Sequence, residues 1–106
     1  MDSPEHAVIV TYSLSGDAFG EPHERDAVRA LKERLTAAIE SAGAGDLDGD
    51  EFGGGEVVLY AYGPDARRLF SAMEPALRTF PARPAHALLR FGDVDEPAAV
   101  EQRIEL

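Results

Sequence analysis

Hydrophobic positions recur along the chain with two different periods, and the changes of period mark the expected strands and helices. Residues 6–13, 56–62 and 85–91 are short apolar runs rich in β-branched or aromatic residues and bounded by Gly or Pro, as buried strands are. Residues 46–52 are predicted to form a short strand or an extended loop. Residues 99–106 alternate apolar and charged positions, which indicates a terminal strand.

Between these strands the apolar positions follow the helical period. A helix of about 20 residues is predicted from Pro22. Its apolar face comprises Val28, Leu31, Leu35, Ala38, Ile39 and Ala42. A second helix is predicted after Gly63, with Pro64 at its first position. Its apolar face comprises Leu69, Phe70, Met73 and Leu77. Pro75 must then lie near the helix end or kink the helix.

The order of these elements predicts an α+β fold. Strand, helix, strand, strand, helix, strand is the split βαβ pattern (βαββαβ) of ferredoxin-like sandwiches, here with an extra C-terminal strand. Right-handed crossovers would place both helices on one face of an antiparallel sheet of order 4-1-3-2, with the extra strand beside the fourth. No linker or repeat interrupts the chain, so residues 1–106 are expected to form a single domain.

Three motifs carry a resemblance. The acidic LDG turn at 47–49, LYAYGPDARRLF at 59–70 and LLRFG at 88–92 resemble a group of small uncharacterised bacterial proteins with an LYxYGPDA-type strand-to-helix motif. The resemblance spans most of the chain and implies one compact α/β domain. It implies no activity and carries over no functional residue.

Charge and composition narrow the classes of partner. The net charge is −10, from 20 acidic and 10 basic residues, which disfavours nucleic acids and anionic membranes as partners. No apolar run approaches the roughly 20 residues of a membrane span, and the N-terminus lacks the features of a secretory signal. A cytoplasmic protein is therefore expected, and the predominance of Arg over Lys together with frequent Ala indicates a bacterial source. The absence of cysteine excludes disulfides and thiolate chemistry.

An acidic segment suggests a cation site. Asp46, Asp48 and Asp50 are spaced like the first ligands of an EF-hand loop, which also needs Gly at its sixth position and Glu at its twelfth. Those positions hold Glu51 and Val57, so the three aspartates are weak metal candidates. A solvated acidic hairpin is the preferred interpretation, and no metal or cofactor is expected.

Glycines and histidines suggest further sites. The glycines at 53–55 precede a strand and have no lysine nearby, so they predict a hairpin turn and not a phosphate loop. The amides after Gly63 could hold a small anion, but Asp65 is the expected helix cap. The histidines His6, His23 and His86 lack metal-ligand spacing, although His6 and His86 lie on predicted neighbouring strands.

The sheet face away from the helices is the main candidate site. Alternation along the strands assigns amphipathic side chains to this face, called here the open face, while Val10, Leu59, Leu89 and Phe91 meet the helices. The candidate binding residues are Ile9, Thr11, Tyr60, Tyr62, His86, Leu88 and Arg90, with Val58 beside them. Apolar patches of this kind usually mark interaction surfaces.

Three classes of function fit these features. The first is a non-catalytic homodimeric binding or regulatory module that recognises a small molecule or a protein, with self-association through the open face, or pairing of the terminal strand, as the dimer contact. The second is a small dimeric enzyme with a site around His86 and Arg90. The third is an acidic inhibitor or immunity-type protein that masks a basic partner. The missing catalytic motifs favour the first class, and a catalytic role is not expected.

Overall fold

The computed structural model describes residues 5–15, 21–93 and 95–106, which form two helices and a five-stranded antiparallel sheet. The elements in chain order are β1 (His6–Ser13), α1 (Pro22–Ala42), β2 (Asp46–Gly53), β3 (Glu56–Gly63), α2 (Ala66–Thr79), β4 (Ala85–Phe91) and β5 (Val100–Glu105). The sequence of residues 14–22, with two glycines and a proline, predicts a loop, and positions 16–20 of it lie outside the described residues. No helix among the described residues is long and apolar enough to cross a membrane.

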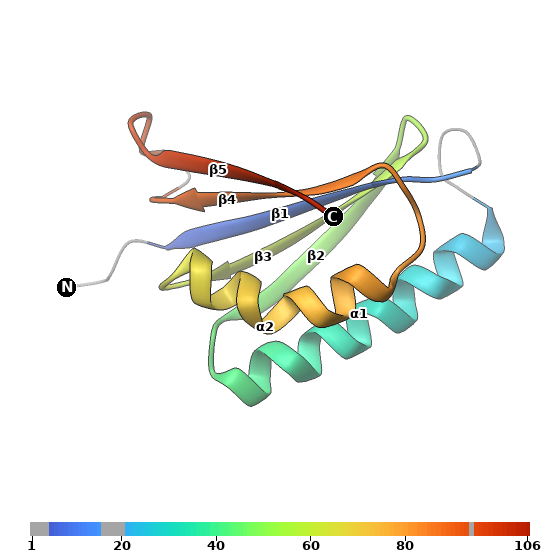
Figure 1. The fold of residues 1–106 in the computed structure, drawn as a ribbon, viewed down its shortest axis with the longest axis horizontal. Coiled ribbons are helices and arrows are strands. Elements are labelled where there is room, and N and C mark those ends of the chain that lie inside the picture. Colours follow the sequence, from blue (N-terminus) through green and yellow to red (C-terminus); the bar gives the residue numbers. More distant parts are fainter. Residues whose placement is uncertain (1–4, 16–20, 94) are drawn as a thin grey trace.

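The strands lie in the order β2-β3-β1-β4-β5, and every neighbouring pair is antiparallel. Both helices lie on the same side of the sheet (Figure 1). This α+β architecture is compatible with a ferredoxin-like sandwich carrying an extra strand at one edge. The predicted bounds of β1 and β4 are confirmed, and residues 46–53 form a full strand despite their polar composition.

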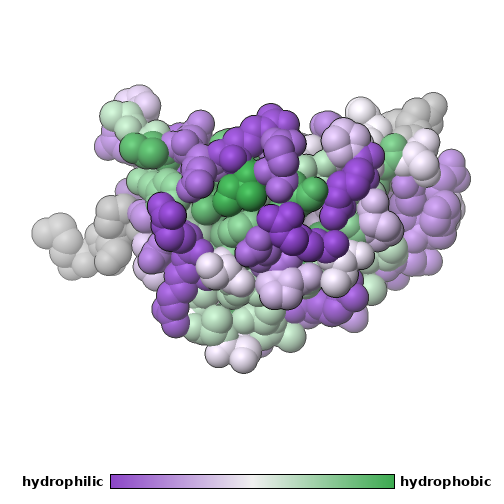
Figure 2. Space-filling view, in the orientation of Figure 1, coloured by the Kyte–Doolittle hydropathy of each residue, from purple (hydrophilic) through white to green (hydrophobic). Residues whose placement is uncertain are grey.

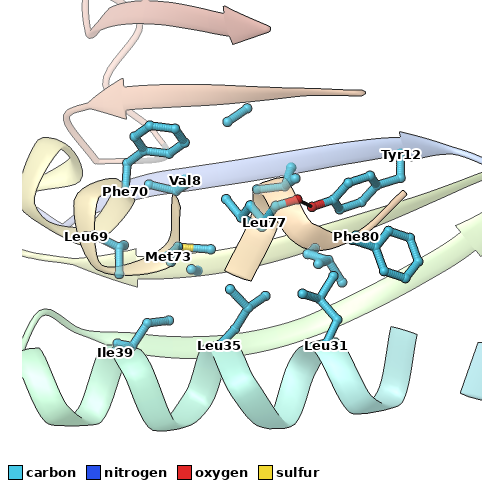
Figure 3. Packing of buried hydrophobic residues seen from close by; sticks show 14 of the residues in the cluster. Val8, Tyr12, Leu31, Leu35, Ile39, Leu69, Phe70, Met73, Leu77 and Phe80 are labelled. Carbon is cyan, nitrogen blue, oxygen red and sulfur yellow. Dashed lines mark hydrogen bonds between the residues drawn. The ribbon is translucent and has the colours of Figure 1, made fainter. Parts of the chain in front are cut away.

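The hydrophobic core lies between the helices and one face of the sheet (Figure 3). Its helical side chains include the large apolar residues predicted from the 3.6-residue period, such as Leu31 and Leu35 of α1, whereas the predicted Ala38 is half-buried and lies outside the cluster. The strands contribute alternate residues, such as Val8 and Val10 of β1. Because the strand period is two, the residues between them point to the opposite face.

The first turn of α1 is held by carboxylates. The side chain of Glu24 accepts a hydrogen bond from the Glu21 amide at 2.9 Å and from the Ser15 amide at 2.8 Å. Glu24 therefore ties the end of β1 to the start of the helix. Gly43 closes α1 in the left-handed conformation at φ 58°, which glycine adopts without strain.

The start of α2 corrects one prediction. The helix begins at Ala66 with Asp65 as its N-cap, so Pro64 precedes the cap and is not the first helical residue. Asp65 accepts from the Arg67 amide at 3.0 Å, and His6 Nδ1 accepts from the Ala66 amide at 3.0 Å. The first amides of α2 are thus satisfied within the chain, which leaves the expected cap in place of an anion site. The helix continues past Pro75 to Thr79.

Side chains also satisfy the last carbonyls of α2. The buried Tyr12 hydroxyl donates to the Leu77 carbonyl at 2.7 Å, and Thr79 Oγ1 donates to the Ala76 carbonyl at 2.7 Å. The Arg83 guanidinium donates to the Arg78 carbonyl at 3.3 Å. Tyr12 is fully buried, so its hydroxyl anchors the end of α2 to the central strand β1.

Tyr12→Phe is expected to lower the free energy of unfolding by about 1–2 kcal/mol, because the Leu77 carbonyl loses a buried donor. Burial raises the pKa of the Tyr12 phenol well above its usual range. The folded state therefore retains a proton that the unfolded state loses above about pH 10, so wild-type stability should fall as the pH rises beyond that point. Urea unfolding at pH 7 and at pH 10.5 measures both effects.

The alkaline loss of stability should be smaller in Tyr12→Phe than in the wild type, since the variant has no phenol to ionise at this position. Tyr60→Phe is the matched control, because its ring is not part of the buried core. Equal alkaline losses in wild type and Tyr12→Phe would contradict the assigned role of this hydroxyl.

Both ends of β3 require glycine, at one end for a tight turn and at the other for close contact between two backbone segments. Gly54 and Gly55 connect β2 to β3 with φ of 59° and 77°, the positive values of a two-residue hairpin turn. At the other end of β3 the chain entering β2 passes so close that a Cβ on Gly63 would lie 2.2 Å from the Ala44 carbonyl oxygen. A Cβ on Gly45 would lie 2.1 Å from the Tyr62 oxygen. Glycine at these positions lets the two backbones touch.

Candidate functional site

The strand register brings the predicted open-face residues together. Ile9 of β1 lies opposite Tyr60 of β3 on one side and Leu88 of β4 on the other. Thr11 likewise lies opposite His86. Residues directly opposite in antiparallel strands share a face, so these side chains form rows across the three central strands. The other two candidates, Tyr62 and Arg90, flank Ala7 in the next row.

The open face has an apolar centre that its own neighbours half bury. Ile9, Val58, Tyr60 and Leu88 are each of intermediate exposure, and none belongs to the core cluster under the helices. Ala7, between Tyr62 and Arg90, is buried with 1% exposure. The larger side chains of neighbouring strands therefore cover the backbone and present a continuous surface to solvent.

Charged residues border this apolar centre on both outer strands. On β2, Asp46 lies opposite Tyr62 and Glu51 lies opposite Val58, so both exposed carboxylates share the open face. On β5 the residues of this face are Glu101, Arg103 and Glu105. The border is acidic along β2 and mixed along β5.

Burial and the acidic border both act on Tyr62. Partial burial raises the pKa of the Tyr62 phenol, and the negative charge of Asp48 adds to this effect, with further contributions from Tyr60 and Glu5. The Tyr62 hydroxyl therefore keeps its proton to a higher pH than an ordinary phenol does. On the opposite border a hydrogen bond from Arg103 lowers the pKa of the Glu105 carboxyl, so this group stays ionised.

Arg90 lies on the open face, but its guanidinium donates hydrogen bonds to carbonyls of the connection between β4 and β5. It donates to the Asp93 carbonyl at 3.2 Å from both Nε and Nη2, and to the Glu96 carbonyl. It also pairs with Glu101 at 2.9 Å. These contacts fasten the β4–β5 connection to the sheet. A substrate anion would have to displace them, which weakens the enzyme hypothesis centred on His86 and Arg90.

The two strand histidines do not approach one another. His6 lies at the end of β1 that pairs with Gly63, while His86 lies opposite Thr11 near the other end and on the opposite face. His6 instead caps α2 and packs edge-on against Phe91, with ring centroids 5.7 Å apart. β1 and β4 are neighbours as predicted, but the register and the opposite faces keep His6 and His86 apart, so the two histidines form no common site.

The three aspartates of β2 also diverge. Asp46 shares the open face with Tyr62, whereas Asp50 lies opposite Leu59 on the helix side and pairs with Lys32 of α1. The register shift between Leu47 and Gly49 causes this divergence, because residues 46 and 50 of a regular strand would share one face. Among the described residues, no group of three or more His, Cys, Asp or Glu side chains could hold a metal ion.

A groove on the helix side was not anticipated from the sequence. It has a volume of about 360 Å³ and lies between the start of α1 and β2. Its lining includes three basic residues of α1, Arg25, Arg29 and Lys32, and the ring of Phe52. The spacing of these bases, at i, i+4 and i+7, is the helical signal that would have identified it. Asp26 and Asp50 pair with two of them, so the groove carries little net charge.

Comparisons with protein-family models, with curated proteins and with solved structures find no match to this chain. The resemblance to small bacterial proteins with the LYxYGPDA-type motif therefore stays a prediction. The surface itself is the basis for assigning a function.

Proposed function

We propose that this protein is a non-catalytic binding or regulatory module, active as a homodimer, that recognises a basic protein partner on the open face of its ferredoxin-like sheet. One observation supports this most strongly. Both helices lie on one side of the sheet (Figure 1). The other side presents an apolar centre bordered by carboxylates.

The apolar centre supplies the contact area. Ile9, Tyr60 and Leu88 are adjacent across three strands, and tyrosine offers a large rigid ring with a polar tip. Residues of this kind in the middle of a surface contribute most of the binding energy of protein interfaces. A partner that inserts apolar side chains here would fully bury Ile9, Tyr60 and Leu88, which are half-buried in the chain alone.

The border determines the charge of the partner. The carboxylates of Asp46, Asp48 and Glu51 favour Lys or Arg around the inserted apolar groups. Two copies stacked face to face would oppose surfaces that are both acidic on balance, on chains that each carry a net charge of −10. The charge therefore favours a basic partner over a second copy on this face. Masking of a basic partner by an acidic inhibitor would use the same surface.

Binding of an amphipathic peptide tests this proposal. A fluorescently labelled peptide of alternating leucine and lysine should bind, and binding should weaken as salt is added, since screening acts on exposed charges. The same peptide with glutamate in place of lysine should not bind. Tyr60→Ser should weaken binding of the lysine peptide roughly tenfold or more, the effect of truncating an interface tyrosine. Fluorescence anisotropy measures each affinity.

Matched charge variants provide the control. Glu51→Gln removes a carboxylate from the open face and should weaken binding, whereas Glu33→Gln removes one from the exposed surface of α1 and should leave the affinity unchanged. Equal affinity for the two peptides, or wild-type affinity in Tyr60→Ser, would refute the proposal.

A further inference from the structure

β5 ends the sheet, and no other strand of the described residues pairs with its outer backbone edge. The Leu106 amide donates to the Ala85 carbonyl of β4 at 3.0 Å. Backbone groups of alternate residues point to the same side of an antiparallel strand. The even-numbered residues of β5 therefore bond to β4, and the backbone groups of Glu101, Arg103 and Glu105 point away from the sheet. Such an edge is a template for pairing with another strand.

The two faces of β5 differ in chemistry. On the open face its side chains alternate in sign as Glu101, Arg103 and Glu105. On the helix side Val100 is 68% exposed, and Ile104 packs against the margin of the core. Figure 2 shows hydrophobic surface at the centre of the view, in the area between β5 and α2. The helices do not cover this strand as they cover its neighbours, so apolar surface is left at the edge.

We infer that two copies of this chain pair antiparallel through β5, with Gln102 on the two-fold axis, to form one continuous sheet. A two-fold axis perpendicular to the sheet keeps the open faces of both copies on the same side, so each residue lies opposite a residue of the same face in the other copy. In this register Glu101 of each copy opposes Arg103 of the other, and Val100 opposes Ile104. Opposite charges and apolar pairs in directly facing positions stabilise antiparallel strands.

Other registers fit the side chains less well. With Arg103 on the axis, Arg103 faces itself and Glu101 faces Glu105, which sets like charges opposite one another three times. With Ile104 on the axis, Arg103 faces Glu105, but only residues 103–105 of β5 pair with β5 of the other copy, so the ladder between the two β5 strands is shorter. The register centred on Gln102 therefore combines matched charges with the longer ladder.

This inference specifies the contact of the homodimer in the proposed function, and it leaves the open face free. The joined sheet would present two open faces on the same side, which would let the dimer bind two basic segments of one partner. Binding of both segments at once would raise the overall affinity of the dimer for the partner, although neither open face gains a contact.

Sedimentation velocity of the purified chain from roughly 10 µM to 1 mM, the range expected for a small interface, tests the pairing. The wild type should show a monomer–dimer equilibrium. Glu101→Arg and Arg103→Glu each set like charges opposite one another twice, and each should weaken the dimer at least tenfold. The double variant exchanges the two charges and should restore the dimer. Glu33→Arg, the same charge change on α1, should dimerise slightly more strongly or as wild type.

Two further measurements distinguish loss of the β5 contact from unfolding of the chain and from loss of the open face as a binding site. Glu101→Arg also breaks the pair with Arg90, so thermal unfolding of each variant must show a folded chain. The double variant lacks the same pair, so its recovery of dimerisation would show that pairing between copies is responsible. Tyr60→Ser should dimerise normally, which separates failure of this contact from failure of the open face as a binding site.

A wild type that stays monomeric to 1 mM would overturn the inference. So would a dimer that both single variants leave intact, or one lost in Tyr60→Ser. A dimer lost in Arg103→Glu but kept in Glu101→Arg would overturn the register centred on Gln102, because in that register the two residues oppose one another and both changes should weaken the dimer.

Discussion

Gly63→Ala is expected to lower the free energy of unfolding by about 3 kcal/mol or more, the upper range for overpacking a tight contact. The new methyl would lie 2.2 Å from the Ala44 carbonyl oxygen, and the clash is with backbone, which cannot rotate away. Relief would require the end of β3 to separate from the turn that enters β2. A small domain is stable by only about 5–15 kcal/mol, so urea unfolding should show a much lower midpoint.

Gly53→Ala is the control for this prediction. A Cβ at position 53 meets nothing within 4 Å, and its backbone is not in the left-handed region, so stability should stay within about 0.5 kcal/mol of wild type. If Gly63→Ala were as stable as Gly53→Ala, the close approach of the two backbones would be wrong.

Leu35→Ala is expected to cost about 3 kcal/mol, within the range measured for large-to-small core substitutions. Leu35 is fully buried on α1 and points towards the sheet, among the residues that join the helices to the strands (Figure 3). The lost side chain leaves a cavity that α1 and the sheet cannot close without breaking other contacts. The midpoint of urea unfolding reports the loss.

Leu35→Met conserves the volume at this position and should cost less than about 1.5 kcal/mol. A similar loss in both variants would indicate that the shape of leucine, and not the filled volume, matters here. A loss below 1 kcal/mol in Leu35→Ala would contradict the packing of α1 against the sheet.

The faces of the central strands were predictable because each follows the two-residue period closely. In residues 56–62, Val57, Leu59 and Ala61 are purely apolar, whereas Val58, Tyr60 and Tyr62 include the polar-tipped rings. The first set is fully buried under the helices, and the second faces the open side. A polar tip needs access to water or a partner, so tyrosine at alternate positions marks the less buried face.

β2 was harder to predict because its own residues hardly favour a strand. Asp46, Asp48 and Asp50 are poor strand formers, and the segment carries little apolar surface. It becomes a strand because the glycine turn folds it back onto β3, which supplies the backbone partners. The pairing of Asp50 with Lys32 compensates the carboxylate that lies on the helix side.

The roles of His6 and Arg90 depend on contacts between residues far apart in the chain. His6 caps a helix that begins 60 residues later, and this pairing requires the crossover that brings α2 back over β1. Arg90 is satisfied by carbonyls of a turn whose path the local sequence does not specify. Residue type and alternation placed Arg90 on the open face correctly, but they could not show that its donors are occupied.

The uncovered sheet face is the central claim, and the three tyrosines test it directly. With 3-fluorotyrosine at positions 12, 60 and 62, assigned by single Tyr→Phe variants, a soluble paramagnetic reagent should broaden the ¹⁹F signals of Tyr60 and Tyr62. The signal of Tyr12, buried beneath α2, should stay sharp. Protection of positions 60 and 62 in the monomer, or broadening of position 12, would contradict the arrangement from which the binding surface is derived.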